Sequence, residues 1–132
     1  MSIEQVPSKI GFLGAGNMAS AIIGGLLDAG LAPERICAAD PSDEARQALA
    51  ARGVTDTAPA PTEAFTRADL VVLAVKPQLM ATAVDDLRPH AREDCTLLSV
   101  AAGISIATLK ALIGNPRQPT ARCMPNTPAL VR

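Results

Sequence analysis

Three small residues near the start of the chain have the spacing of a dinucleotide-binding turn. Gly14, Gly16 and Ala19 form the pattern Gly-x-Gly-x-x-Ala directly after the short apolar run 9–13, and helix-forming residues follow at once. In such a turn the first glycine permits the tight bend and the second lets the backbone approach a pyrophosphate. The third small residue lets the helix pack closely on the strand. Because the helix N-terminus also offers free N–H groups to phosphate oxygens, we predict a nucleotide site here; a merely structural turn is the alternative.

Two charged residues stand where strands are expected to end, which is where ligands of parallel sheets bind. Asp40 ends a short apolar run, and an acidic residue in this place hydrogen-bonds the adenosine ribose in dinucleotide-binding folds. Its alternative role is a helix N-cap, since Pro41 follows it. Lys76 precedes Pro77, which disfavours helical geometry and leaves the lysine extended at the mouth of the crevice. A solvated surface lysine is the alternative there.

Two further strand ends carry small or polar residues. The stretch SVAAG at 99–103 could lie flat against a nicotinamide ring, or could be a packing turn. In the stretch RCMPNTP at 122–128, prolines bracket Asn126 and Thr127, which predicts a rigid, polar, non-helical loop.

The elements that must position these residues alternate between strand and helix. The run at 70–75 is apolar throughout, as in a parallel strand that is covered on both faces. Alternation of this kind predicts an α/β fold: a Rossmann-type doubly wound sheet, mainly parallel, with helices on both faces, in one domain over 1–132. The expected strands are 9–13, 36–40, one near Val54, 70–75, 96–100 and 120–124, and the expected helices are 17–29, 42–52, 62–68, 77–87 and 105–113.

Composition narrows the function classes. The 132 residues carry a net charge of −1 with scattered basic residues, which argues against nucleic acid as a partner. No apolar run reaches membrane-spanning length and the first residues lack the pattern of a signal peptide. Cys37, Cys95 and Cys123 have neither metal-binding spacing nor an even number, so we predict free thiols in a cytoplasmic protein and no metal site.

Four stretches together resemble pyrroline-5-carboxylate reductase in content, order and spacing. They are FLGAGNMA (12–19), AVKPQ (74–78), SVAAGI (99–104) and RCMPNTP (122–128), and the resemblance extends from Lys9 to Arg132. It implies reduction of 1-pyrroline-5-carboxylate to L-proline by hydride from NADPH or NADH, the last step of proline biosynthesis.

The resemblance also assigns site residues. It implies a pyrophosphate cradle, a segment that lies along the cofactor, a flank of the nicotinamide, and a pair beside the reacting end. It assigns no catalytic acid or base, and no residue of this chain has a claim to that role. The pyrophosphate cradle would be Leu13, Gly14, Ala15, Gly16, Asn17 and Met18, and the segment along the cofactor would be Ala74, Val75, Lys76 and Pro77. The nicotinamide would be flanked by Val100, Ala101 and Ala102, and the pair beside the reacting end would be Asn126 and Thr127.

The sequence departs from the family in two places. An asparagine that the family often carries near the adenosine ribose is replaced here by Ala60-Pro61-Thr62. The chain stops at Arg132, whereas the family continues into a helical half that supplies the dimer interface and much of the substrate pocket. We therefore expect this chain to be the cofactor-binding half of a homo-oligomeric enzyme. By itself it should bind a cofactor and should not catalyse the reduction of the substrate.

Alternatives remain open for the function and for the cofactor. Another Rossmann dehydrogenase acting on hydroxy acids, or a nucleotide-binding module without a reaction, would contain the same glycine turn. Asp40 favours NADH, since it would repel a 2′-phosphate, although Ser42, Arg35 or Arg46 could receive that phosphate. We expect both NADH and NADP(H) to bind.

Overall fold

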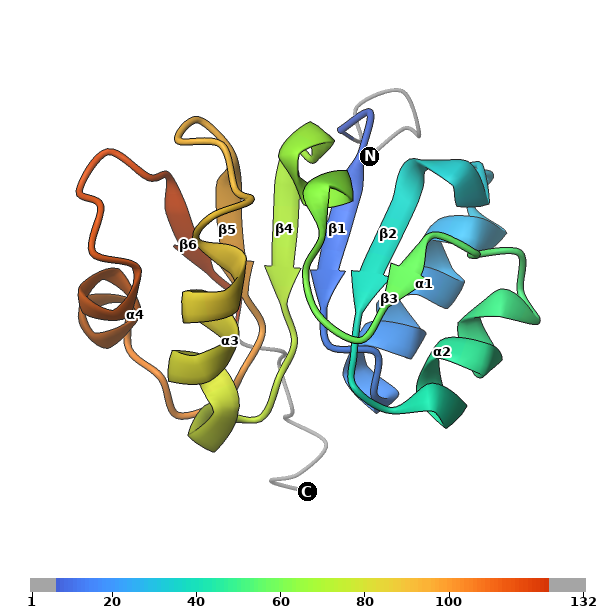
Figure 1. Ribbon diagram of the computed structural model, residues 1–132, viewed down its shortest axis with the longest axis horizontal. Helices are drawn as coiled ribbons and strands as arrows, with labels where there is room; N and C mark the ends of the chain where they lie inside the picture. Colours follow the sequence, from blue (N-terminus) through green and yellow to red (C-terminus); the bar gives the residue numbers. More distant parts are fainter. Residues whose placement is uncertain (1–6, 124–132) are drawn as a thin grey trace, which may run out of the picture.

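The computed structural model describes residues 7–123, which form a six-stranded sheet in which every paired strand runs parallel. The strand order is β3-β2-β1-β4-β5-β6 (Figure 1). This order confirms the predicted Rossmann-type α/β fold. The strands are β1 (Ile10–Leu13), β2 (Ile36–Ala39), β3 (Thr57–Ala58), β4 (Leu70–Leu73), β5 (Thr96–Ser99) and β6 (Thr120–Arg122).

The central strand β1 pairs with β2 on one side and β4 on the other, with Gly11 opposite both Cys37 and Val71. After β3 the chain crosses β2 and β1 to start β4, so the strand order reverses between β1 and β4. In parallel sheets a crevice opens at the carboxyl ends of the strands at such a reversal. The fold therefore places the segments after β1, β2 and β4 around one crevice.

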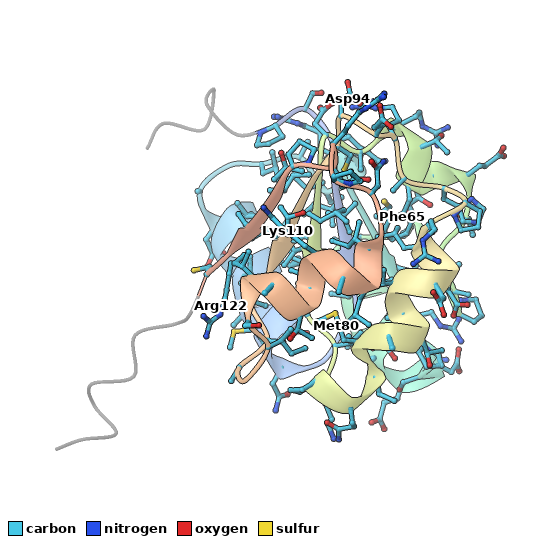
Figure 2. All side chains as sticks on the ribbon, turned by 90° about the vertical axis from the view of Figure 1, so that its left-hand side faces the viewer. Phe65, Met80, Asp94, Lys110 and Arg122 are labelled. Atoms are coloured by element: carbon cyan, nitrogen blue, oxygen red, sulfur yellow. The ribbon has the colours of Figure 1, made fainter. Side chains whose placement is uncertain are left out.

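Helices cover both faces of the sheet. On one face α1 (Asn17–Asp28) and α2 (Asp43–Ala50) pack on strand residues such as Phe12, and on the other lie α3 (Met80–Leu87) and α4 (Ile106–Ile113). Figure 2 shows α3 and α4 side by side on this second face, with Phe65 and Met80 among its side chains. Both residues are at most 1% exposed, and Phe12 on the first face is fully buried, so the apolar core lies on both sides of the sheet.

A glycine in the central strand makes room for an aromatic ring. Phe65 lies in a short 3-10 helix, η3 (Glu63–Arg67), which belongs to the crossover between β3 and β4. A Cβ on Gly11 would lie 2.7 Å from the Phe65 Cε2 atom and 2.8 Å from Cδ2. The absent side chain at Gly11 thus lets the Phe65 ring rest directly on the backbone of β1.

Several element boundaries differ from the sequence prediction. The third strand is Thr57–Ala58 and not near Val54, because Val54 is a buried residue of the loop after α2, where its N–H donates to the Leu49 carbonyl. The helix expected at 62–68 is present as the 3-10 helix η3, over Glu63–Arg67. The expected helix 77–87 divides into the 3-10 helix η4 (Pro77–Leu79) and α3, and another 3-10 helix, η2 (Pro33–Arg35), precedes β2.

The strand predicted at 70–75 ends at Leu73. The N–H of Ala74 still donates to Leu13 at 2.8 Å, but β1 turns away at Gly14. Residues after Ala74 therefore have no strand partner on that side, and the chain leaves the sheet toward the crevice.

Candidate functional site

The turn after β1 requires a glycine at its first position. Gly14 has a φ of +102°, a conformation that residues with a side chain rarely adopt, and its N–H donates to Ala39 at 2.8 Å. A Cβ at this position would lie 2.8 Å from the carbonyl oxygen of Ala74. Gly14 is thus a structural glycine that holds β1, β2 and β4 together at their carboxyl ends.

The second glycine of the turn has no such structural reason. Gly16 has a φ of −77°, which any residue adopts, and nothing lies within 4 Å of the position where its Cβ would be. Space in front of this backbone is therefore available to a ligand. A close-approaching pyrophosphate is the kind of ligand that needs a glycine there.

The N-terminus of α1 is equipped for an anion. Its N-cap, Gly16, makes no side-chain capping bond, and its first turn carries no acidic residue. By contrast, Ser42 caps α2 and Ser105 caps α4, each accepting a backbone N–H at 3.1 Å. Free N–H groups and the helix dipole both favour negative charge. The N-terminus of α1 can therefore hold a phosphate, whereas a serine side chain already accepts an N–H group at the N-termini of α2 and α4.

A cleft of about 450 Å³ lies at the carboxyl edge of the sheet, in front of this turn. Its size is that of ordinary small-molecule sites. Seven of the sequence-predicted cofactor residues line it, namely Leu13, Gly14, Gly16, Asp40, Ala74, Val75 and Lys76. The others within the described part of the chain, Ala15, Asn17, Met18, Pro77, Val100, Ala101 and Ala102, are not among its lining residues, and Asn126 and Thr127 lie outside the described residues.

Asp40 joins the end of β2 to the glycine turn. One carboxylate oxygen accepts the N–H of Ala15 at 2.7 Å and the other accepts the N–H of Ser42 at 2.8 Å. Because the N-cap of α2 is Ser42 and not Asp40, the capping alternative is wrong. The carboxylate is held at the cleft wall, while its contact with a ribose stays a prediction.

The cations suggested for a 2′-phosphate lie in different places. Arg46 lies beside Asp40: its Nε donates to the Asp40 carbonyl at 3.0 Å and its Nη2 lies 3.6 Å from an Asp43 oxygen. Arg35 precedes the amino end of β2 and donates to the carbonyls of Ser8 and Pro7. Arg35 is therefore at the edge of the sheet opposite the cleft, and its predicted phosphate role is wrong.

Lys76 has the extended backbone predicted for a residue before proline, with φ −62° and ψ 147°. Its side chain is exposed and lines the cleft. Within residues 7–123 no hydrogen bond or ion pair of this side chain is found. The position is consistent with a cofactor contact, which stays a prediction.

The segment after β5 is folded against the sheet. Val100 donates its N–H to Leu73 at 3.2 Å, and the buried Ser99 accepts the N–H of Ala101 at 3.3 Å. Val100 and Ala101 are each 7% exposed. This part is a packing turn as well as a candidate nicotinamide flank, and its contact with a cofactor stays a prediction.

Sequence reasoning missed about half of the cleft wall. One group that was not assigned to the cofactor follows β2 and β3, although the family resemblance had placed Ala60 and Pro61 near the adenosine ribose. The other is one face of η4 and α3, and its signal was a helical spacing of 3, 4 and 7 residues counted from Leu79. The residues that were not assigned are Ala39 at the end of β2; Pro41, Pro59, Ala60 and Pro61; and Leu79, Thr82, Ala83 and Asp86.

A second hollow, of about 400 Å³, lies between the C-terminal ends of α3 and α4. Its arginine, Arg88, already donates to the carbonyls of Leu112 and Ile113 and pairs with Asp85 at 2.9 Å. Since this arginine closes the end of α4 and the hollow is away from the strand carboxyl ends, we assign it a structural role.

Other chemistry is limited in the described residues. Burial raises the pKa of both the Cys37 and the Cys95 thiols to about 11, so both are neutral and poor nucleophiles at physiological pH. Residues 7–123 contain no cluster of three or more side chains suited to holding a metal ion. In the same residues no helix is long and apolar enough to cross a membrane.

Comparison with known proteins agrees with the glycine turn and the strand order. The model of a family described as NADP oxidoreductase coenzyme F420-dependent matches residues 9–103. A curated pyrroline-5-carboxylate reductase of Pseudomonas aeruginosa is 46% identical over 124 residues, which cover 94% of this chain and 45% of that relative. The solved pyrroline-5-carboxylate reductase of Coxiella burnetii aligns with a TM-score of 0.83 and 31% identity, over 94% of this chain and 46% of that one.

A hydroxy acid dehydrogenase shares the architecture only. The 3-hydroxyisobutyrate dehydrogenase of Mycobacterium tuberculosis aligns with a TM-score of 0.71 but at 24% identity, over 89% of this chain and 39% of that one. The chain spans about half the length of the curated relatives it matches.

Proposed function

The chain belongs to the family described as NADP oxidoreductase, coenzyme F420-dependent, and we propose that it is the dinucleotide-binding half of a pyrroline-5-carboxylate reductase. Relatives that are 37–46% identical over almost the whole of this chain carry that name, which supports the proposal. The hydroxy acid alternative has only a fold-level likeness behind it.

Gly16 is the observation that carries the proposal. Neither its backbone conformation nor its surroundings within the described chain require a glycine, and it stands at the uncapped start of α1. The residues present thus fit a dinucleotide, since the missing side chain at Gly16 leaves the backbone N–H groups at the start of α1 open to a phosphate. The cofactor would bind with its pyrophosphate at Gly14 and Gly16, Lys76 at the cleft mouth, and Val100 to Ala102 toward the nicotinamide.

The reaction proposed for the whole enzyme is hydride transfer to a cyclic imine. The reduced nicotinamide supplies the hydride, the carbon of the protonated C=N bond accepts it, and L-proline is the product. Residues of this chain bind and orient the hydride donor. None of the described side chains is placed as an acid, a base or a carboxylate anchor, and we assign Asn126 and Thr127 to the reacting end.

We further propose that a second half of the enzyme supplies the substrate pocket and a homo-oligomeric interface, and that the enzyme acts in the cytoplasm. Catalysis needs the imine within ~3–3.5 Å of the nicotinamide with water largely excluded. A cleft open on one side does not meet that need.

For the cofactor, we propose that both NADH and NADPH bind, with a small preference for NADH. The Asp40 carboxylate is fixed by two N–H groups and would repel a 2′-phosphate, while the guanidinium of Arg46 lies close enough to offset part of that repulsion. An Asp40→Ser substitution should shift the preference toward NADPH. Asp28→Ser, at the last residue of α1 and outside the cleft, is the matched control, and an unchanged preference in Asp40→Ser would reduce Asp40 to a structural tether.

The test of the function uses calorimetry and an activity assay. Titration of the chain with NADH and NADPH should give saturable binding, and addition of 1-pyrroline-5-carboxylate should give no oxidation of the bound cofactor. The product of the native open reading frame should catalyse that oxidation and should be inactive toward hydroxy acids. Absence of dinucleotide binding refutes the cofactor role. Turnover by the 132-residue chain, at a rate near that of the longer protein, refutes the division into two halves.

A further inference from the structure

One face of α3 and the preceding η4 lies along the cleft. Leu79, Thr82, Ala83 and Asp86 line it, and their spacing of 3, 4 and 7 residues places them on one side of a helix. Leu79 is 53% exposed, and among the described residues the one other exposed large apolar side chain is Met18, at 41%. An apolar side chain left open at the mouth of a cleft indicates a ligand surface.

The rest of this part of the cleft comes from the segments after β2 and β3. Pro41 follows β2, while Pro59 and Pro61 follow β3; all three line the cleft. Proline side chains are rigid and apolar, and they bring no backbone N–H group. Together with Leu79 they form a wall suited to a flat, apolar-faced group, such as a purine base.

The glycine turn fixes which part of a dinucleotide would reach this wall. The pyrophosphate site follows β1, and Asp40, the candidate ribose contact, follows β2. The segments after β2 and β3 therefore lie on the adenosine side, whereas the segment after β5 lies on the side proposed for the nicotinamide. The adenine would then lie between the prolines and Leu79.

Asp86 is the carboxylate on this wall that the fold does not use. Asp40 is held by two backbone N–H groups, and Asp85, one residue away on α3, pairs with Arg88 at 2.9 Å. For Asp86, no hydrogen bond or ion pair with another described residue is found, and its side chain is exposed at the cleft. Asp85 does not line the cleft.

We propose that Asp86 determines base specificity by accepting a hydrogen bond from the exocyclic amino group of adenine, while Leu79 and Ala83 pack on the base. This inference rests on the proposed dinucleotide function. An amino group donates to a carboxylate, whereas hypoxanthine presents a carbonyl oxygen at the same place and would face the negative charge. An asparagine at 86 can donate to that carbonyl.

Calorimetry with two probes tests the inference: NADH and its hypoxanthine analogue, titrated into the full 132-residue chain. The wild type should bind NADH about tenfold more tightly, as expected for one charge-assisted hydrogen bond at an exposed site. Asp86→Asn should weaken NADH binding several-fold and remove or reverse the preference. Asp85→Asn, a matched change outside the cleft, should leave both affinities unchanged, and Leu79→Ser should weaken both probes alike.

The outcomes separate the two proposals. A wild-type chain without preference, or an Asp86→Asn variant that keeps the wild-type ratio of affinities, overturns the role of Asp86 and leaves the dinucleotide function standing. Failure of the wild type to bind either probe overturns the function and the inference together. Loss of the preference in Asp85→Asn as well would assign the effect to the net charge of α3 and overturn the specific contact.

Discussion

Substitution of Gly16 by valine should separate cofactor binding from folding. Nothing lies within 4 Å of the Cβ position, and the φ of −77° suits a branched residue. The added side chain would therefore project into the space in front of α1 without a clash in the described protein. A dinucleotide pyrophosphate, which must approach this backbone, would collide with it.

The structure gives the expected magnitudes. Replacing glycine restricts the unfolded chain, which stabilises by about 0.4–1 kcal/mol, and the poorer N-cap offsets a similar amount. The free energy of unfolding should thus change by less than about 1 kcal/mol, which corresponds to less than roughly 5 °C in Tm for a domain of this size. Loss of one or two charge-assisted hydrogen bonds to phosphate should weaken binding by about 100-fold or more.

The neighbouring glycine supplies the contrast. Gly14→Ala places a side chain at φ +102° and a Cβ 2.8 Å from the Ala74 carbonyl oxygen, so it should lower stability by about 1–3 kcal/mol or more. Scanning calorimetry measures both melting temperatures, and titration calorimetry with NADH and NADPH measures the affinities. The chain has no tryptophan or tyrosine, which makes intrinsic fluorescence a poor probe.

Two results would refute this reasoning. A Gly16→Val variant that binds NADH within about threefold of the wild type would show that no pyrophosphate approaches residue 16. A variant that melts far below the wild type would show that Gly16 serves the fold, and the argument from its empty surroundings would fail.

Three further predictions follow from the described contacts. Lys76→Ala should weaken dinucleotide binding and leave Tm nearly unchanged, because this side chain has no partner in the described residues; a large loss of Tm at unchanged affinity contradicts it. Hydrogen bonds from Arg92 and Ser8 lower the pKa of Asp69 in the folded protein. The ionised carboxylate therefore stabilises the fold at any pH above about 4, the ordinary pKa of a carboxyl group, and this stabilisation is lost as the pH falls through the lowered pKa of the folded state. Asp69→Asn should flatten the acid limb of Tm against pH, and Asp28→Asn should not. A chromogenic thiol reagent at mildly alkaline pH should modify Cys123 in the native protein, and should modify the buried Cys37 and Cys95 only after unfolding; absorbance counts the modified thiols. Rapid labelling of all three cysteines in the native protein would contradict the burial of Cys37 and Cys95.

The alternation of strands and helices could be predicted from the sequence because buried parallel strands read as short apolar runs separated by helical segments. The run at 70–75 is an example: its core, β4, pairs on both sides. The third strand was misplaced, since Val54 has the apolar character of a strand but is buried in the loop after α2, with its N–H bonded to the Leu49 carbonyl. Thr57–Ala58, the actual strand, has only two residues and is held at the sheet edge by β2 alone.

For the candidate site too, the features set by neighbouring residues in the sequence could be predicted, and the features set by contacts between distant segments could not. The glycine turn and the extended Lys76 depend on neighbours in the sequence, so the residue types alone indicate them. The wall made by Leu79 and Asp86 depends on how α3 docks beside the segments after β2 and β3, which no local pattern specifies. The hydrogen bond that holds Asp40 to Ala15 likewise joins residues that are far apart in the chain.

The contact between Phe65 and Gly11 constrains how this sequence can vary. The two positions share one volume, with the ring of one resting where the side chain of the other would be, 2.7 Å from its Cβ position. An alanine at 11 should be tolerated only together with a smaller side chain at 65, so that Gly11→Ala destabilises alone and is rescued by Phe65→Leu. Among homologous sequences the two positions should then change as a pair. The crossover between β3 and β4, which carries Phe65, would then keep its packing on β1 as long as the summed volume of the side chains at 11 and 65 stays constant.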